Sequence, residues 1–189
     1  VNMRQDYEHD GARPWRGMKR DQWEGGHRVP FIARWPGRIR AGSTSDQTVC
    51  LCDIMATCAD VAGVQLPDDA AEDSFNILPA MLGEPNGKEA VRSYTLHQTS
   101  RLELAIRREK WKYLDHQGSG GNDYERDILR PYAIPETQPD ALGQLYNLET
   151  DPGETTNLYF EHPDIVEELK AQLDTFRRSG RSAPLRQNG

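Results

Sequence analysis

Hydrophobic residues are spaced differently in the two halves of the chain. From Asp53, apolar residues recur with a helical period until Gly63, and a shorter helical run covers residues 77–82. Residues 29–35 form a short apolar and β-branched run with glycines on both sides, which predicts a strand. The first ninety residues therefore combine strand and helix signals, as expected for the end of an α/β domain.

Beyond residue 90 the pattern favours strands. Residues 91–98 predict one strand, and residues 102–116 predict a β-hairpin because apolar residues alternate on both sides of Arg108. Residues 117–140 are rich in glycine and proline and predict a long irregular connection, of the kind that is either functional or mobile. A further strand is expected near residue 145, just before a Pro-Gly turn.

A long amphipathic helix is predicted from Pro163 to the residues before Gly180. Its first turn is acidic and its last turn is basic, which suits the helix dipole. We expect its apolar stripe to pack on one face of the antiparallel sheet. The stripe comprises Ile165, Val166, Leu169, Leu173 and Phe176, and the expected sheet face comprises Leu102, Leu104, Ile106, Trp111 and Tyr113.

These elements predict an α/β chain in which a small α+β subdomain, an antiparallel sheet with a long C-terminal helix, follows the end of an α/β domain. The predicted divisions are residues 1–92, 93–181 and a tail at 182–189. Because the first residues are polar and show neither a strand nor a helix period, we expect a further part of the protein to precede them.

Charge and composition exclude some classes of function. The chain has 189 residues and a net charge of −7, which disfavours nucleic acid as a partner. No apolar run approaches the length of a membrane span, so no membrane partner is expected. Cys50, Cys52 and Cys58 lie too close together to staple distant segments and fit no zinc spacing, so we interpret them as buried free thiols.

Three segments in order resemble the sulfatase family. The stretch "GMKRDQWEGGHRVPFIARWPGRI" resembles the family's Gly-x-Lys-x-x-x-x-Glu-Gly-Gly-x-Arg-x-Pro segment, and "AIRREKWKYL" resembles its Ala-Ile-Arg-x-Gly-x-Trp-Lys hairpin. The stretch "LYNLETDPGETTNL" is similar to a segment near the C-terminus of these enzymes. Together the three segments are specific for the family.

The resemblance implies an alkaline-phosphatase-like fold and hydrolysis of a sulfate ester by a formylglycine, made from an N-terminal Cys or Ser, with the aid of calcium. Lys19 matches the lysine that reaches the sulfate group in this family. Glu24, Gly25 and Gly26 would shape the turn that carries Lys19, and Arg28 would fix that turn to the domain. His97 would line the rim of the substrate site.

Each of these residues also has a structural interpretation. A lysine in a polar loop is usually a solvated charge, and Glu24 and Arg28 have the spacing of a structural ion pair. His97 also fits a surface imidazole, and we interpret His27 as a packing variation. The position after Arg108 holds Glu109 where the family usually has glycine, which predicts a looser hairpin.

We expect the formylglycine residue and the acidic metal ligands to be absent from this chain, which would then be the C-terminal portion of a sulfatase, inactive by itself and without a cofactor. The resemblance implies a periplasmic or extracellular parent that acts on a sulfated small molecule or saccharide. Exposed sheet edges predict self-association. Two alternatives stay open: a phosphate or phosphonate monoester hydrolase of the same superfamily, and a non-catalytic module that binds anionic glycans.

Overall fold

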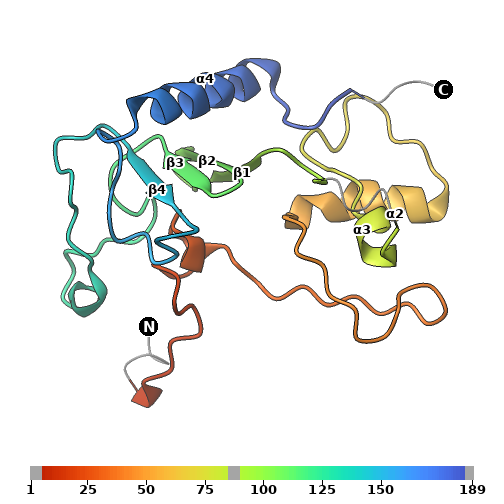
Figure 1. Cartoon of the computed structure of the whole chain (residues 1–189), viewed down its shortest axis with the longest axis horizontal. Coiled ribbons are helices and arrows are strands. Elements are labelled where there is room, and N and C mark those ends of the chain that lie inside the picture. The colour runs from red at the N-terminus through yellow and green to blue at the C-terminus, as the bar shows by residue number, and fades with distance from the viewer. Residues whose placement is uncertain (1–5, 85–89, 186–189) are drawn as a thin grey trace. The chain divides into compact units, whose positions relative to one another are not determined.

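The computed structural model describes residues 6–84 and 90–185, which fold as two compact units (Figure 1). The first unit combines Val1–Val29 with Leu96–Leu173, and the second combines Pro30–Thr95 with Asp174–Gly189. The change of unit near residue 95 lies close to the predicted division at residue 92. The N-terminal segment, however, belongs with the sheet rather than with the helices that follow it.

The first unit is built on an antiparallel sheet of four strands in the order β1-β2-β3-β4, which confirms the predicted strands after residue 90. The strands are β1 (Thr95–Gln98), β2 (Leu104–Arg108), β3 (Trp111–Leu114) and β4 (Gln144–Asn147). Glu109 lies in the tight β2–β3 turn with a φ of 51°, a left-handed conformation that a glycine adopts more easily. The predicted hairpin therefore forms without the glycine.

Strand register assigns the side chains of the sheet to two faces, because neighbours along a strand point to opposite sides. On one face, Ile106 pairs with Tyr113, which pairs with Leu145. On the other face, Ala105 pairs with Leu114, and Lys112 pairs with Tyr146. Five of these seven side chains come from the β2–β3 hairpin and two from β4, and all seven are at most 1% exposed. Both faces of the sheet are therefore covered.

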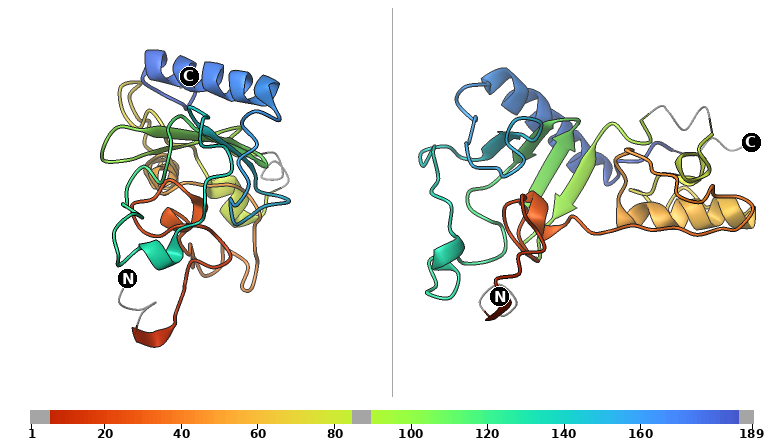
Figure 2. Two further views of the ribbon diagram at one scale, coloured as in Figure 1. Left: turned by 90° about the vertical axis from the view of Figure 1, so that its left-hand side faces the viewer. Right: turned by 60° about the horizontal axis from the view of Figure 1, so that its bottom comes forward.

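Helix α4 (Pro163–Ser179) covers the first face, as predicted (Figure 2, left). Val166, Leu169 and Leu173 are its buried residues. On this face Arg108 forms an ion pair with Glu168, and the ring of Trp111 lies 5.0 Å from that of His162. The prediction that Leu102 belongs to the sheet face under the helix is wrong. Leu102 is 73% exposed and lies in the β1–β2 turn with a φ of 66°.

The segment before residue 29 covers the second face of the sheet. Trp23 packs in a buried cluster with Ala105, Leu114 and Tyr146, and its indole N–H donates to Gln144 Oε1 at 3.1 Å. The ribbon views show this segment passing the sheet on the side away from α4 (Figure 2). The small sheet is thus sandwiched between α4 and the N-terminal segment.

The second unit contains the predicted helices as α2 (Ile54–Ala62) and α3 (Leu78–Leu82). Each ends at a glycine in the left-handed conformation, Gly63 with a φ of 65° and Gly83 with a φ of 71°. A 3₁₀ turn, η2 (Leu51–Asp53), precedes α2. Both helix predictions are confirmed, including their C-terminal glycines.

A buried polar hub organises the second unit. Asp53 is fully buried, and its carboxylate accepts hydrogen bonds from the backbone N–H of Cys50 and of Phe75. Arg92 forms an ion pair with the same carboxylate at 2.6 Å. The hydroxyl of Thr57 accepts from the N–H of Ile77. Polar anchors therefore help to fix the start of α2 in this unit.

Three predictions for this unit are wrong. Residues 29–35 are extended but pair with no strand in the described part of the chain, so the apolar pattern alone did not make a strand. The predicted apolar stripe of α2 is solvent-exposed, with Met55 51% exposed and Val61 48% exposed. The cysteines are free, as predicted, but Cys52 and Cys58 are exposed rather than buried.

The predicted C-terminal tail begins with an anchored stretch. The N–H and hydroxyl of Ser182 both donate to Asp73 Oδ1, and Ala183 is 6% exposed. Residues 186–189 lie outside the described residues. In the described ranges, none of the helices has the length and apolar character needed to cross a bilayer.

Candidate functional site

The Glu-Gly-Gly stretch forms a 3₁₀ turn, η1 (Glu24–Gly26), on the second face of the sheet. A Cβ on Gly26 would lie 2.0 Å from the carbonyl oxygen of Asp21, and one on Gly25 would lie 2.6 Å from that of Arg16. No side chain fits at such distances. The two glycines are therefore required because the chain folds back against its own backbone.

The carboxylate of Glu24 lies in a buried charged cluster under the sheet. Lys112, from β3, places its ammonium group 3.1 Å from Glu24 Oε1 and 2.9 Å from Glu154 Oε1. The second carboxylate oxygen of Glu154 accepts the backbone N–H of Glu24 at 2.6 Å. All three side chains are at most 1% exposed. One lysine thus joins two glutamates from distant parts of the sequence.

The charges of this cluster explain the proton affinity of its members. Burial by itself would raise the pKa of Glu24, but the positive charges around it, Lys112 foremost, lower that pKa to about 2. Burial raises the pKa of Glu154, and Lys112 only partly offsets this. Glu24 is therefore ionised at neutral pH and forms the negative centre of the cluster.

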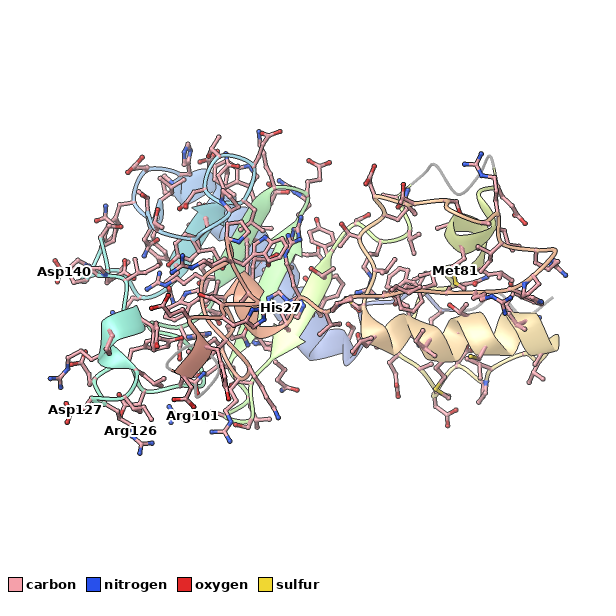
Figure 3. The ribbon with its side chains drawn as sticks, turned by 90° about the horizontal axis from the view of Figure 1, so that it is seen from below. His27, Met81, Arg101, Arg126, Asp127 and Asp140 are labelled. Carbon is pink, nitrogen blue, oxygen red and sulfur yellow. The ribbon has the colours of Figure 1, made fainter. Side chains whose placement is uncertain are left out.

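Two histidines stack beside the cluster. The rings of His27 and His97 lie 3.7 Å apart and nearly parallel, and Lys112 Nζ donates to His27 Nε2 at 3.2 Å. Burial and the nearby Lys112 charge lower the pKa of His27 to about 4, and burial lowers the pKa of His97 well below its ordinary value. Both rings are neutral at pH 7. Figure 3 shows His27 close to the strands of the sheet.

Two arginines complete the cluster. Arg28 Nε donates to Glu24 Oε2 at 2.6 Å, and its guanidinium group lies 4.6 Å from the centre of the Trp15 ring. Arg107, from β2, reaches the same oxygen at 3.4 Å. Arg28 therefore closes the turn by holding Glu24 and Trp15. This geometry fits the structural interpretation of the Glu24–Arg28 pair.

Lys19, like Arg20 beside it, lies outside this cluster of paired charges. It is exposed, and within residues 6–84 and 90–185 its ammonium group has no hydrogen bond or ion pair. Lys19 and Arg20 occupy the tip of a turn that the N–H of Asp21 closes by donating to the carbonyl of Met18 at 2.9 Å. The fold thus presents one lysine to solvent from a turn with a rigid base.

The structure separates the predicted site residues into two groups. Glu24, Gly25, Gly26, Arg28 and His97 meet in the buried cluster or its surroundings, whereas Lys19 lies outside the cluster on its own turn. The roles predicted for Lys19 in catalysis and for His97 in substrate binding stay predictions. His97 is half-buried and stacked on His27 rather than a free surface ring.

Sequence reasoning missed Lys112 and Glu154, although both were within reach. Lys112 is the second lysine of the "KWKYL" stretch, and Glu154 is the glutamate of "DPGETTNL". Each belongs to one of the three segments that carry the family resemblance, and Glu24 belongs to the remaining one. The three segments therefore meet at one buried ion cluster. The sequence signal that could have identified Lys112 and Glu154 is that both are charged residues within these segments.

The described residues do not fit a calcium site by themselves, because no three of their His, Cys, Asp or Glu side chains are grouped to hold a metal ion. In the family that the sequence resembles, formylglycine is made within a Cys/Ser-x-Pro-x-Arg pattern, which we expect to be missing from this chain. The pattern does occur once, at residues 182–186, so this expectation is wrong. Ser182 belongs to the C-terminal anchor on Asp73, whereas the resemblance places the modified residue N-terminal to Lys19. We therefore assign Ser182 no role in chemistry.

Comparisons with known proteins agree with these segments. Residues 15–120 match the family model described as "N-sulphoglucosamine sulphohydrolase, C-terminal". An N-acetylgalactosamine-6-O-sulfatase of Bacteroides thetaiotaomicron is 32% identical over 86% of this chain and 30% of its own length. An N-acetylgalactosamine-6-sulfatase of Canis lupus familiaris is 46% identical over 80% of this chain and 30% of its own length.

A solved structure from work on glycosaminoglycan metabolism by Bacteroides thetaiotaomicron matches with a TM-score of 0.70 and 32% identity. It covers 87% of this chain and 32% of its own chain, so the match is to about a third of an alkaline-phosphatase-like fold. The chain spans about a third of the length of the relatives it matches. It belongs to the sulfatase family and corresponds to the C-terminal part of these proteins.

Proposed function

We propose that this chain is the C-terminal part of a sulfatase that hydrolyses sulfate esters of saccharides, and that Lys19 binds the sulfate group. The observation that carries the proposal is the exposed ammonium group of Lys19, which has no hydrogen bond or ion pair among the described residues and stands on a turn whose base is held by the buried Asp21. A fixed positive charge stabilises the negative charge that builds up on the ester oxygens as the bond to sulfur breaks.

The names of two relatives support a substrate class for this proposal. Both, one bacterial and one mammalian, are named for the 6-sulfate of N-acetylgalactosamine. A saccharide that ends in N-acetylgalactosamine 6-sulfate is therefore the first substrate to test. Periplasmic or extracellular action is part of the same proposal.

Calcium and formylglycine are proposed cofactors of the whole protein. The described residues supply neither a metal site nor a residue placed for conversion to formylglycine. When present, these groups would provide the nucleophile and a further positive charge on the sulfate. The role of this chain is then to present Lys19 to the sulfate group and to hold the turn that carries Lys19 in a fixed position.

The test is Lys19→Ala in the full-length protein. We expect kcat/KM for sulfate release to fall by about a hundredfold or more, as for other charges used in a transition state. The melting temperature should stay unchanged, because the Lys19 side chain contacts no described partner. The matched control is Lys110→Ala, because Lys110 is 44% exposed and pairs with the exposed Glu149.

The same assay separates the alternatives. Release of phosphate but not sulfate from matched esters would indicate the phosphate or phosphonate hydrolase. Calorimetric binding of sulfated saccharides without turnover by the full-length protein would indicate the glycan-binding module. Normal activity of the Lys19→Ala protein would show that Lys19 is a solvated surface charge without a role in sulfate binding.

A further inference from the structure

The turn that carries Lys19 has an unusual backbone. Met18 and Asp21 close it, and Arg20 at its third position has a φ of 92°. A residue other than glycine is strained at such a φ, so contacts with neighbouring residues have to hold the turn in place. The contacts that do so come from the loop after β3, about a hundred residues further along the chain.

Asp21 and Asn122 hold this turn by hydrogen bonds, and we call these two residues the clamp. Asp21 is 4% exposed, and its Oδ2 accepts the N–H of Met18 at 2.8 Å and the hydroxyl of Tyr124 at 2.6 Å. The amide Nδ2 of Asn122 donates to Asp21 Oδ1 at 2.8 Å and to the carbonyl oxygen of Lys19 at 3.0 Å. One amide group thus ties the backbone of Lys19 to the buried carboxylate.

The loop that supplies Asn122 is itself held tightly against the turn. The carbonyl of Ser119 accepts the N–H of Gln22 at 2.8 Å, and the Ser119 hydroxyl donates to the carbonyl of Asn122 at 2.6 Å. A Cβ on Gly121 would lie 2.1 Å from the carbonyl oxygen of Arg20. The stretch is irregular, as predicted, and its glycines let Asn122 approach the Lys19 turn.

We propose that Asn122, acting with Asp21, is a positioning residue for Lys19. A lysine reaches its target through a flexible four-carbon chain, so the place where that chain begins decides whether the ammonium group meets the sulfate. Displacement of a catalytic group by about 1 Å can cost a hundredfold in rate. These two residues hold the carbonyl oxygen of Lys19 and the N–H of Met18 just before it. This inference rests on the proposed function of Lys19.

The experiment uses the full-length protein with a saccharide that ends in N-acetylgalactosamine 6-sulfate. Asn122→Ala should lower kcat/KM by about tenfold or more, mainly through kcat, because the ammonium group is misplaced at the transition state. In the Lys19→Ala background the same substitution should change kcat/KM by less than about twofold, since no ammonium group remains to be positioned. Asp123→Ala, an exposed neighbour in the same loop, is the control.

A second, milder variant tests the same proposal if Asn122→Ala fails to fold. Tyr124→Phe removes only the hydroxyl that donates to Asp21, while the ring keeps its edge contact with Trp23 at 5.5 Å. It should show the same dependence on Lys19 with a smaller loss.

The outcomes separate the two proposals. If Lys19→Ala is inactive and both clamp variants are fully active, the positioning role is overturned and the function of Lys19 stands. Equal losses of activity in the presence and absence of Lys19 would show a merely structural role and also overturn it. Normal activity of Lys19→Ala would instead overturn the proposed function.

Discussion

The ammonium group of Lys112 lies 2.9 Å from Glu154 Oε1 and 3.1 Å from Glu24 Oε1, and none of the three side chains is more than 1% exposed. The three residues come from β3, from the turn after β4 and from η1. Because a buried charge is costly unless it is paired, removal of any member leaves the others uncompensated. This cluster therefore holds the Lys19 segment against the sheet.

Loss of the lysine should destabilise the protein strongly. Lys112→Met leaves two buried carboxylates without their shared cation and should lower the free energy of unfolding by about 3 to 5 kcal/mol. Lys110→Met removes a surface pair and should cost less than about 1 kcal/mol. Urea unfolding followed by tryptophan fluorescence measures both. Similar values for the two variants would show that the buried cluster contributes nothing special.

The glycines of η1 can be tested in the same way. Gly26→Ala places a methyl group 2.0 Å from the backbone oxygen of Asp21. The clash is with backbone, so rotation of a side chain cannot relieve it. We expect a loss of about 3 kcal/mol or more, or failure to fold. Gly11→Ala is the control, because its nearest neighbour, at 3.3 Å, is the end of the His9 side chain. Wild-type stability of Gly26→Ala would mean that the turn is built differently.

Acid should destabilise the first unit through His27. Its pKa in the folded protein is about 4, below the ordinary value of 6.5, so between these values the unfolded chain binds a proton that the folded chain does not. Stability is therefore lost as the pH falls from 6.5 to 4, by roughly 3 kcal/mol for a shift of this size. Glu24, with a pKa of about 2, adds a further loss below pH 4.5.

Unfolding free energies measured from pH 7 to pH 4 test this dependence. His27→Gln should flatten the curve in that range, and His9→Gln, which changes an exposed histidine, should leave it unchanged. A steep curve that persists in His27→Gln would assign the acid sensitivity to other groups, with His97 the first to examine because burial lowers its pKa too.

Local patterns predicted the elements of this protein well. The two helix-ending glycines, the hairpin and the amphipathic helix from Pro163 are all signals carried by a few neighbouring residues. The strand at residues 29–35 could not be judged in this way, because a strand exists only when another segment pairs with it. The helical period of the apolar residues in α2 was likewise a local signal, and it did not show that Met55 and Val61 are exposed.

The candidate site was predicted only in part, for a similar reason. The resemblance identified Lys19 and the Glu24 turn, because these residues lie within one short segment. The partners that fix them, Lys112, Glu154 and Asn122, lie about ninety or more residues away, and no local spacing links them to the turn. Such contacts appear only when the sheet is assembled.

Packing of α4 on the sheet gives the last prediction. Leu169 and Leu173 are fully buried, and the sheet face beneath the helix carries Ile106 and Tyr113, which are at most 1% exposed. Leu169→Ala should therefore lower the free energy of unfolding by about 2 to 4 kcal/mol, through lost burial and the cavity that remains. Leu142→Ala, at a leucine that is 80% exposed, should change it by less than about 0.5 kcal/mol.

Hydrogen exchange shows whether helix and sheet unfold together. If they form one cooperative unit, Leu169→Ala should speed exchange in β2 and β3 as much as in the first eleven residues of α4, since one opening reaction exposes both. Faster exchange confined to the helix would show that α4 detaches alone. The sheet would then be held by the contacts of Trp23 and the Lys112 cluster on its other face, and the predicted cooperativity would be wrong.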